Sequence, residues 1–372
     1  MAEITPIVMP KWGLSMKEGT VNEWLVEEGT EITVGMPILD VETDKIANAV
    51  EAPDAGLLRR RVASAGDTLP VKALLGVLAP STVSDADVDA YVASYVTPAE
   101  DADEGEEAAA YHFADVDGIR VRYASRGGDD AARPVLLFIH GFGGDLDNWL
   151  FNLDALAEKN RVFALDLPGH GQSTPKVPGT SLADLSKFVG KFMDVVGIDK
   201  AHLVGHSMGG GIAAQMAVDQ PSRVESVALI SPSGFGDEVN NAYTEGFVKA
   251  ESRRELKPVV ELLFANPELV SRQMLDDLLK YKRLDGVTDA LASLNGGLFA
   301  GGKQSAKPGA QLKDVGKPVL VIWGEKDQII PVAHAKNAPS GATVRVFDDA
   351  GHMSQMEKAN EVNALLKEHV SR

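Results

Sequence analysis

The stretch AHLVGHSMGGGIAAQ, residues 201–215, decides the fold of most of the chain. Its apolar start AHLVG predicts a buried strand and IAAQMAVDQ predicts a helix, so Ser207 lies at the turn between them. A serine in such a strained turn leaves no room for side chains two residues to either side, which explains Gly205 and Gly209. The start of the helix stabilises negative charge that develops beside it. The alternative is a glycine-rich turn with an incidental serine, which the flanking strand and helix disfavour.

Strands and helices alternate from Tyr111 onward. A hairpin is predicted over 113–127, and buried parallel strands are predicted at 135–140, 161–167, 201–206, 224–231, 318–324 and 343–348. Residues 181–197 predict a helix whose apolar face is Leu182, Leu185, Phe188, Val189, Phe192, Val195 and Val196. A helical interruption at about 237–302 predicts an inserted cap over the carboxyl edge of the sheet, and a closing helix runs to Arg372.

A serine nucleophile needs a base and an acid that orients the base. The strand PVLVIWG leads into GEKDQIIP, which places Asp327 on the loop at its carboxyl end, and the next strand leads into His352. Nucleophile, acid and base follow each other in the chain order of α/β-hydrolases. The rival acids are Glu325, Asp348 and Asp349.

The segment from Tyr111 to Arg372 therefore resembles the α/β-hydrolase superfamily, with a helical cap. The matching motifs are HGFGG (140–144), DLPGHGQS (166–173), GHSMGG (205–210), WGEKDQIIP (323–331) and AGHMSQME (350–357). The resemblance implies that Ser207 is the nucleophile, His352 the general base and acid, and Asp327 the residue that orients it. It also implies an oxyanion hole made by the backbone N–H groups of Phe142 and Met208. Three other histidines are interpreted as residues that shape loops: His140, His170 and His206.

The first segment, residues 1–79, consists of short alternating runs broken by Gly and Pro, typical of small antiparallel strands. It repeats itself at an offset of 37 residues, which pairs Gly19, Leu25, Gly29, Ile32 and Val34 with Gly56, Val62, Gly66, Leu69 and Val71. Two similar four-stranded halves around a pseudo-dyad would produce this pattern, with glycines at turns.

VETDKIANAVEA, residues 41–52, places Lys45 between two strands of this segment. A lysine at a hairpin tip ordinarily serves solubility alone. Beside the repeat and the opening WGLSMKEGTV, however, Glu-Thr-Asp-Lys resembles the lipoyl domain of 2-oxo acid dehydrogenase acyltransferases, an all-β flattened barrel or sandwich. The resemblance implies covalent lipoate on Lys45. Related biotinyl domains flank their lysine with methionines, so Asp44 and Ile46 favour lipoate.

Residues 80–110 differ in composition from both flanking segments. They contain no Lys or Arg and are dominated by Ala, Asp and Glu. Such a segment repels itself and buries little surface, so a flexible, extended linker is predicted. The competing interpretation is a short helix at VDAYVASYV, residues 88–96.

Bulk composition limits the classes of function. Of 372 residues, 44% are hydrophobic and 24% charged, as in ordinary globular proteins, and the formal net charge of −18 argues against binding nucleic acid or an anionic membrane. The chain has no cysteine, which excludes disulfides and a thiol nucleophile of its own. No signal peptide, long apolar run or metal-ligand spacing is found, so we expect a cytoplasmic, metal-free protein.

Over its whole length the chain resembles the dihydrolipoamide acetyltransferase components of bacterial acetoin dehydrogenase complexes, which join a lipoyl domain to an α/β-hydrolase body. This resemblance implies transfer of an acetyl group from lipoyl sulfur to coenzyme A. The implied partners are thiamine-diphosphate-dependent acetoin dehydrogenase subunits, dihydrolipoamide dehydrogenase and a lipoate-attaching enzyme. The His-x-x-x-Asp-Gly motif of ordinary acyltransferase cores and a basic subunit-binding domain are absent. Two alternatives remain: a serine hydrolase acting on a thioester, ester or carbon–carbon bond, and an inactive body that only carries the lipoyl domain.

Overall fold

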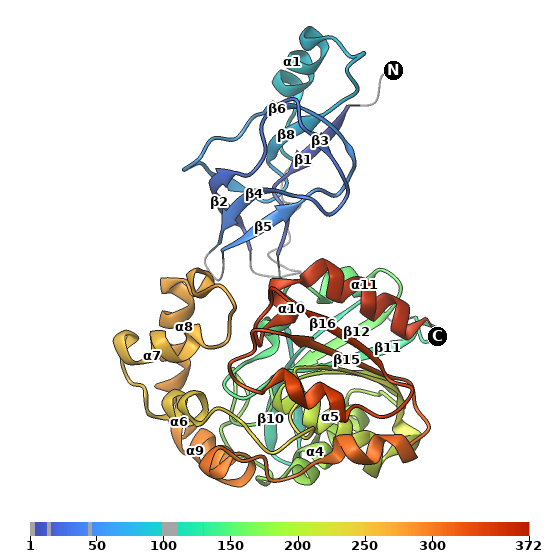
Figure 1. Ribbon diagram of the computed structural model, residues 1–372, viewed down its shortest axis with the longest axis vertical. Coiled ribbons are helices and arrows are strands. Elements are labelled where there is room, and N and C mark those ends of the chain that lie inside the picture. Colours follow the sequence, from blue (N-terminus) through green and yellow to red (C-terminus); the bar gives the residue numbers. More distant parts are fainter. Residues whose placement is uncertain (1–3, 13–15, 44–46, 99–110, 129, 372) are drawn as a thin grey trace. The chain divides into compact units, whose positions relative to one another are not determined.

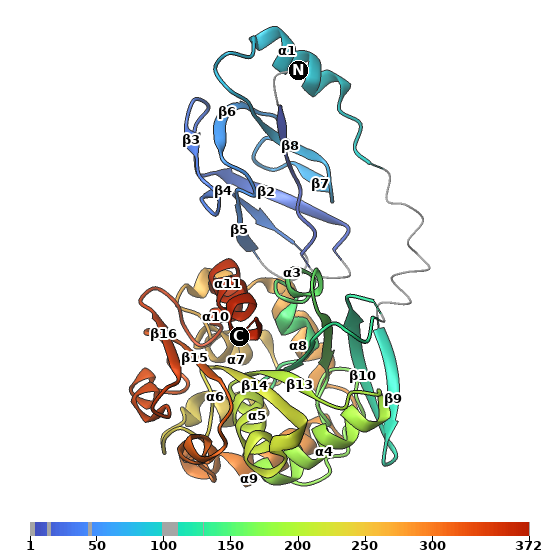
Figure 2. The same ribbon diagram turned by 90° about the vertical axis from the view of Figure 1, so that its right-hand side faces the viewer.

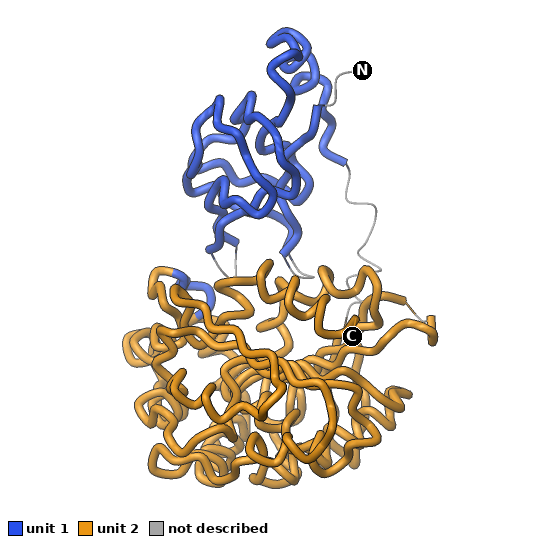
Figure 3. The backbone as a smooth tube through the Cα atoms, turned by 45° about the vertical axis from the view of Figure 1, so that its right-hand side comes forward, with its two compact units in different colours: residues 1–108, 269–274 blue, residues 109–268, 275–372 orange. Residues whose placement is uncertain are grey.

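The computed structural model describes residues 4–12, 16–43, 47–98, 111–128 and 130–371. The chain divides into two compact units, residues 1–108 with 269–274 and residues 109–268 with 275–372 (Figure 3). Each unit has its own buried apolar residues.

The first unit is built from short strands: β1 (Thr5–Val8), β2 (Glu18–Trp24), β3 (Glu31–Ile32), β4 (Pro37–Glu42), β5 (Ala47–Glu51), β6 (Gly56–Arg61), β7 (Thr68–Pro70) and β8 (Leu74–Leu78). Within the described residues they form two four-stranded sheets, in the orders β1-β8-β6-β3 and β5-β4-β2-β7. Exchanging β1–β4 with β5–β8 converts one order into the other. The predicted all-β fold with two similar halves is therefore confirmed.

The repeat is strongest at its turns. Gly29 and Gly66 occupy equivalent positions and have φ angles of 89° and 92°, which favour glycine. The apolar members are less uniform: Leu25 and Val62 are equivalent and both exposed, but Val34 is exposed whereas its equivalent Val71 is buried. The core between the sheets includes Ile7, Val21, Ile38, Leu39, Val41, Leu58 and Leu75.

For the first part of residues 80–110 the prediction of an extended linker is wrong, and the competing interpretation, a short helix, is correct. Helix α1 (Asp85–Ser94) forms there, capped by the Ser84 side chain, which accepts a hydrogen bond from the Asp87 N–H. Val88 is fully buried on the core of the first unit. The acidic residues of α1 are neutralised from β6, where Arg59 lies 2.8 Å from Asp85 and Arg60 lies 2.9 Å from Asp89. The rest of the predicted linker, residues 99–110, lies outside the described residues.

The second unit contains the strands β9 (Tyr111–Val116), β10 (Ile119–Arg126), β11 (Val135–Ile139), β12 (Arg161–Leu165), β13 (Ala201–His206), β14 (Val224–Ile230), β15 (Val319–Gly324) and β16 (Thr343–Phe347). Over the described chain they form an eight-stranded sheet in the order β16-β15-β14-β13-β11-β12-β10-β9. The pairs β9–β10 and β10–β12 are antiparallel, and the other neighbours are parallel. The predicted α/β-hydrolase sheet is confirmed.

Helices cover both faces of this sheet (Figures 1 and 2). One face carries α4 (Leu182–Val195) and α5 (Met208–Asp219), and the other carries α3 (Leu153–Ala157) and α11 (Ala359–Val370), which α10 (Ser354–Glu357) precedes. The predicted apolar face of α4 is buried from Leu182 to Phe192, but Val195 is 52% exposed at the last turn. None of the helices in the described ranges is both long and apolar enough to cross a membrane.

A helical insertion separates β14 from β15. It consists of α6 (Asn241–Lys249), α7 (Arg253–Glu261), α8 (Arg272–Lys282) and α9 (Val287–Leu298), which appear in yellow and orange in Figure 1. Leu256, Leu291 and Leu294 are fully buried within it. These helices fall inside the interval 237–302, where the sequence predicts a cap.

Candidate active site

Ser207 occupies the turn between β13 and α5 with φ 54° and ψ −117°, a backbone conformation that non-glycine residues rarely adopt. Hydrogen bonds connect this turn to β14 and to the loop after β14. The Ser207 N–H donates to the Ile230 carbonyl at 2.9 Å, and the Ser207 carbonyl accepts from the Ser233 N–H at 2.9 Å. The nucleophile predicted from the sequence therefore lies on a strained turn fastened to the centre of the sheet.

The glycines around Ser207 are required by close approach of the backbone. A Cβ atom on Gly205 would lie 2.4 Å from the Gly209 carbonyl oxygen, and one on Gly209 would lie 2.1 Å from the Ile139 carbonyl oxygen. Both distances are far inside van der Waals contact. This confirms the physical reason given above for glycine two residues to either side of the serine.

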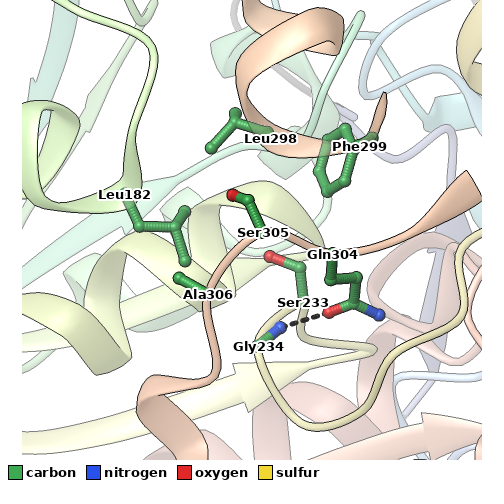
Figure 4. Close-up of a pocket in the computed structure, with 8 residues that line it drawn as sticks. All are labelled: Leu182, Ser233, Gly234, Leu298, Phe299, Gln304, Ser305 and Ala306. Carbon is green, nitrogen blue, oxygen red and sulfur yellow. Dashed lines mark hydrogen bonds between the residues drawn. The ribbon is translucent and has the colours of Figure 1, made fainter. Parts of the chain in front are cut away.

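A small pocket beside this turn, lined in part by Ser233, has no room for a water molecule. Figure 4 shows the small pocket between the start of α4 and the loop that follows β14. Gln304 closes it: its Oε1 accepts from the Gly234 N–H, and its Nε2 donates to the Glu238 carbonyl at 2.7 Å. The pocket has no space for a substrate. Its lining residue Ser233 is hydrogen-bonded to Ser207, so this packing supports the turn.

His352 and Asp327 form a buried pair. The His352 Nδ1 lies 2.8 Å from Asp327 Oδ2, and the two side chains are 1% and 0% exposed. Asp327 also accepts hydrogen bonds from the N–H groups of Ile329 and Ile330, at 2.8 and 3.0 Å. An ionised carboxylate held in this way places the histidine proton on Nδ1 and leaves Nε2 as the basic nitrogen.

The rival acids are elsewhere. Asp349 forms an ion pair with Lys358 at 2.5 Å, and Glu325 and Asp348 are exposed. Of the four candidate carboxylates, Asp327 is the one that contacts His352. The geometry thus agrees with Asp327 as the orienting acid, the role that the resemblance to α/β-hydrolases implies.

Two further histidines brace the loops of the site as neutral imidazoles. His140 Nε2 accepts from the Leu167 N–H at 2.9 Å, so its Nδ1 carries the proton and donates to the Gly141 carbonyl at 2.8 Å. His206 Nε2 lies 3.0 Å from the His352 carbonyl oxygen. Burial first, and then a neighbouring histidine, holds the pKa of both His140 and His206 well below the usual range. These contacts support their interpretation as loop-shaping residues.

The loop after β11 lies against the nucleophile. A Cβ atom on Gly141 would be 3.0 Å from Ser207 Cβ, so the chain at Phe142 passes directly beside the serine. Within the described part of the chain, no hydrogen bond uses the backbone N–H of Phe142 or of Met208, the first residue of α5. Two free N–H donors beside a serine, one of them at a helix N-terminus, can stabilise an oxyanion.

In the first unit, β4 and β5 pair in antiparallel fashion up to Glu42 and Ala47. Residues 43–46 connect these paired strands. Lys45 itself lies outside the described residues, as do Asp44 and Ile46.

Comparison with known proteins extends the sequence resemblance. Residues 5–78 match the biotin/lipoyl family, described as biotin-requiring enzymes, and residues 134–359 match the alpha/beta hydrolase fold family. The dihydrolipoyllysine-residue acetyltransferase component of the acetoin cleaving system of Cupriavidus necator is 74% identical over 99% of this chain and 97% of its own length. The chain belongs to this acetyltransferase family. The member from Pseudomonas putida is 46% identical over 99% of this chain and 100% of its own length.

The body of this acetyltransferase is also similar to hydrolases. A 2-hydroxy-6-oxononadienedioate/2-hydroxy-6-oxononatrienedioate hydrolase of Paraburkholderia phymatum is 30% identical over 67% of this chain and 90% of its own length. The solved meta-cleavage product hydrolase of Pseudomonas fluorescens IP01 superposes with a TM-score of 0.63 at 23% identity, covering 70% of this chain and 97% of its own. At that identity the structural likeness shows the fold alone.

The structure shows two residues that support the site and that the sequence did not point to, Trp323 and Glu357. Trp323 donates its indole N–H to Asp327 Oδ2 at 3.1 Å, a contact that the motif WGEKD could have suggested. Glu357 accepts from the N–H groups of Gly351 and Ala265, both at 2.7 Å, and so anchors the loop before His352. Ala265 lies far from His352 in sequence, in the insertion, and no local motif predicts that contact.

No group of three His, Asp or Glu side chains within the described residues could hold a metal ion.

Proposed function

We propose that this chain is an acyl carrier and its own acyltransferase: it receives an acetyl group on lipoyl-Lys45 and passes it to coenzyme A through Ser207. The observation that carries the proposal is the buried His352–Asp327 pair beside the Ser207 turn, in a chain that also has a lipoyl domain. An ordinary histidine-based transferase motif is absent from the sequence, so the serine site is the candidate for the transfer.

Lipoate fits the first unit, where a four-residue connection containing Lys45 joins two paired strands. Bound there, it would supply a dithiol that holds the acetyl group as a thioester. Coenzyme A is the proposed acceptor, because the family is one of acetyltransferases and a thiol acceptor conserves the thioester bond.

The residues of the second unit divide the chemistry in two steps. In the first, Ser207 Oγ attacks the thioester carbonyl while His352 Nε2 takes the hydroxyl proton. The N–H groups of Phe142 and Met208 stabilise the oxyanion, and His352 then protonates the departing sulfur, which leaves an acetyl ester on Ser207. In the second, His352 takes the coenzyme A thiol proton, the thiol attacks the ester, and the proton returns to Ser207.

Asp327 keeps the imidazole in the correct tautomer throughout. Its two oxygens already accept from Trp323, Ile329 and Ile330, so the carboxylate does not need to move as His352 gains and loses a proton. A preorganised carboxylate avoids reorganisation during the reaction.

The proposed partners are those of an acetoin cleaving system. They are thiamine-diphosphate-dependent acetoin dehydrogenase subunits that load the acetyl group, a dihydrolipoamide dehydrogenase that reoxidises the dithiol, and a lipoate-attaching enzyme. The relatives' names support the system as a whole, while these separate partners and a cytoplasmic location stay predictions.

A serine hydrolase is the second candidate, favoured by the 30% identical hydrolase relative. The two candidates differ only in what attacks the acetyl ester. Water would release acetate, whereas coenzyme A would yield acetyl-coenzyme A.

The experiment supplies acetyl-dihydrolipoamide with and without coenzyme A and measures dihydrolipoamide, acetate and acetyl-coenzyme A. We expect Ser207→Ala to lower acetyl-coenzyme A formation by at least about 10³-fold, as loss of a serine nucleophile does. Asp327→Asn should lower it by about 10³-fold or more, because the histidine tautomer is lost, whereas Asp349→Asn should stay within about twofold. A Ser207→Ala protein that makes acetyl-coenzyme A at the parent rate would contradict the proposal, and acetate as the main product would favour the hydrolase.

A further inference from the structure

Helix α6 begins against the loop that holds the catalytic acid. Asn240, its N-cap, accepts from the Ala242 N–H at 2.9 Å and donates its Nδ2–H to the Gln328 carbonyl at 2.7 Å. The Asn240 backbone N–H also donates to the Ile329 carbonyl at 2.8 Å. Because Ile329 in turn donates to Asp327, the start of α6 is tied to the residues that surround the acid.

The same helix then reaches the loop after β11. The Tyr243 hydroxyl donates to the Phe142 carbonyl at 2.9 Å, and Tyr243 is only 5% exposed. The Phe142 ring is surrounded by three other rings, with centroids 6.0 to 6.2 Å away: Phe247, Phe299 and His170. Phe142 is therefore held at its carbonyl and at its ring, while its N–H has no partner within the described residues.

The last turn of α6 is fixed from α8. Lys282, buried at 6% exposure, donates its ammonium hydrogens to the carbonyls of Phe247 and Ala250. Phe247 in turn packs on the β11 loop, since a Cβ atom on Gly143 would lie 2.7 Å from its ring. A cation at a helix C-terminus is favourable for the exposed carbonyls there, so Lys282 keeps α6 in place against the loop.

From these contacts we infer that α6 is the positioning element of the active site, and that Tyr243 is the positioning residue that aims the Phe142 N–H at the developing oxyanion. The inference rests on the proposed role of that N–H. An oxyanion donor must sit within a fraction of an ångström of its position, because its stabilisation falls steeply with distance and angle. The Phe142 N–H lies in the peptide before Phe142, whereas the Tyr243 hydroxyl holds the carbonyl of the peptide after it. With the ring also packed in place, this hydrogen bond restrains the Cα of Phe142 and thereby the position of its donor nitrogen.

The hydroxyl and the ring of Tyr243 have separable roles. The ring packs 5.9 Å from Phe247 and fills space in the insertion, whereas the hydroxyl touches the oxyanion loop. Tyr243→Phe removes the hydroxyl and keeps the ring, so it tests alignment with little change in packing. Burial raises the pKa of Tyr243, so the hydroxyl keeps its proton and stays a donor over the working pH range.

Tyr281→Phe is the matched control. Tyr281 on α8 also donates its hydroxyl from the insertion to a backbone carbonyl of the main body, that of Gly169, at 2.6 Å. The control loses the same kind of hydrogen bond, but at a loop that carries no proposed oxyanion donor. Thermal midpoints of both variants establish that each is folded.

The assay measures the dihydrolipoamide formed from acetyl-dihydrolipoamide by the full chain with coenzyme A present, separated by chromatography because transfer leaves the total number of free thiols unchanged. We expect Tyr243→Phe to lower kcat by about tenfold with KM within about twofold of the parent, a part of the 10²–10³-fold effect of a lost oxyanion donor. Tyr281→Phe should leave both constants within about twofold. A trifluoromethyl ketone that forms a tetrahedral adduct with Ser207 should bind Tyr243→Phe about tenfold more weakly, in step with kcat, because it uses the same donors.

The inference is overturned if Tyr243→Phe keeps the parent kcat and the parent affinity for the ketone, or if Tyr281→Phe loses as much of both. Failure of the proposed function is a distinct result. If acetate accumulates in place of acetyl-coenzyme A, the transfer assignment is wrong, yet dihydrolipoamide formation and ketone binding still decide the role of Tyr243.

Discussion

Asp327 shows how a residue acquires its role from its surroundings. Three N–H donors, from Trp323, Ile329 and Ile330, fix the carboxylate of Asp327. Its Oδ2 also lies within hydrogen-bond distance of His352 Nδ1. Asp349 has the same chemistry and lies nearer to His352 in sequence, but it pairs with Lys358 on the surface. The difference between them is burial and partners, which sequence distance does not measure.

His170 gives the stability of the fold a dependence on pH. It is fully buried, and burial lowers its pKa to about 4, against about 6.5 in an unfolded chain. Between pH 6.5 and pH 4 the imidazole is therefore protonated in the unfolded state but stays neutral in the folded state. The free energy of unfolding consequently falls as pH decreases from 6.5 toward 4. His170 alone should contribute about 2 kcal/mol to the loss between pH 7 and pH 5.

Urea unfolding of the parent and of His170→Asn at both pH values measures this contribution. Asn can still donate to the Pro168 carbonyl, as His170 Nδ1 does at 3.1 Å, but it does not titrate. The variant should lose about 2 kcal/mol less than the parent on going from pH 7 to pH 5. An equal loss in the two proteins would show that His170 becomes protonated in the folded state.

At the scale of elements, α1 shows that a local composition can mislead. The acidic sequence between 80 and 110 predicts self-repulsion, and that argument holds only while no positive charge is near. Arg59 and Arg60 on β6, more than twenty residues away in sequence, supply that charge, and Val88 supplies an apolar contact. The helix thus depends on tertiary contacts more than on its own propensity.

We expect Val88→Asp to melt α1, because it places a charge in the apolar contact with the first unit. Hydrogen exchange on the full chain should show amides of 88–94 exchanging as fast as in an unstructured peptide. The matched control is Ala86→Asp, an exposed position on the same helix, which should keep the parent exchange rates. Slow exchange in Val88→Asp would mean that α1 is stable without its buried contact.

At the scale of the whole molecule, the two units have different tasks that one substitution can separate. Lys45→Arg keeps the positive charge but cannot accept lipoate through an amide bond. In the assembled acetoin cleaving system this variant should make no acetyl-coenzyme A from acetoin. It should retain the parent rate with free acetyl-dihydrolipoamide, because the Ser207 site is unchanged.

Intact mass and peptide mapping of the parent from its native host provide the control, and should place one lipoyl group on Lys45. An unmodified Lys45 during growth on acetoin, or a Lys45→Arg complex with parent activity, would refute the carrier role.

Most of the architecture could be predicted from the sequence because its signals are local. The alternation of buried strands and the glycines around Ser207 depend on residues close together in the chain, and the 37-residue repeat is the same local pattern occurring twice. The structure bears all three out. The exposed Val195 and the helix α1 are the exceptions, and in both a contact with another element, made or missing, decides the outcome.

The sequence by itself determined the two folds, the strained turn at Ser207 and the chain order of Ser207, Asp327 and His352, since each rests on backbone sterics or periodicity over a few residues. Only the tertiary structure decided which carboxylate meets His352 and which insertion residues touch the oxyanion loop. Asp327 and His352 are 25 residues apart, and Tyr243 and Phe142 are 101 apart. Contacts over such separations depend on how helices and loops pack, so no local pattern in the chain encodes them.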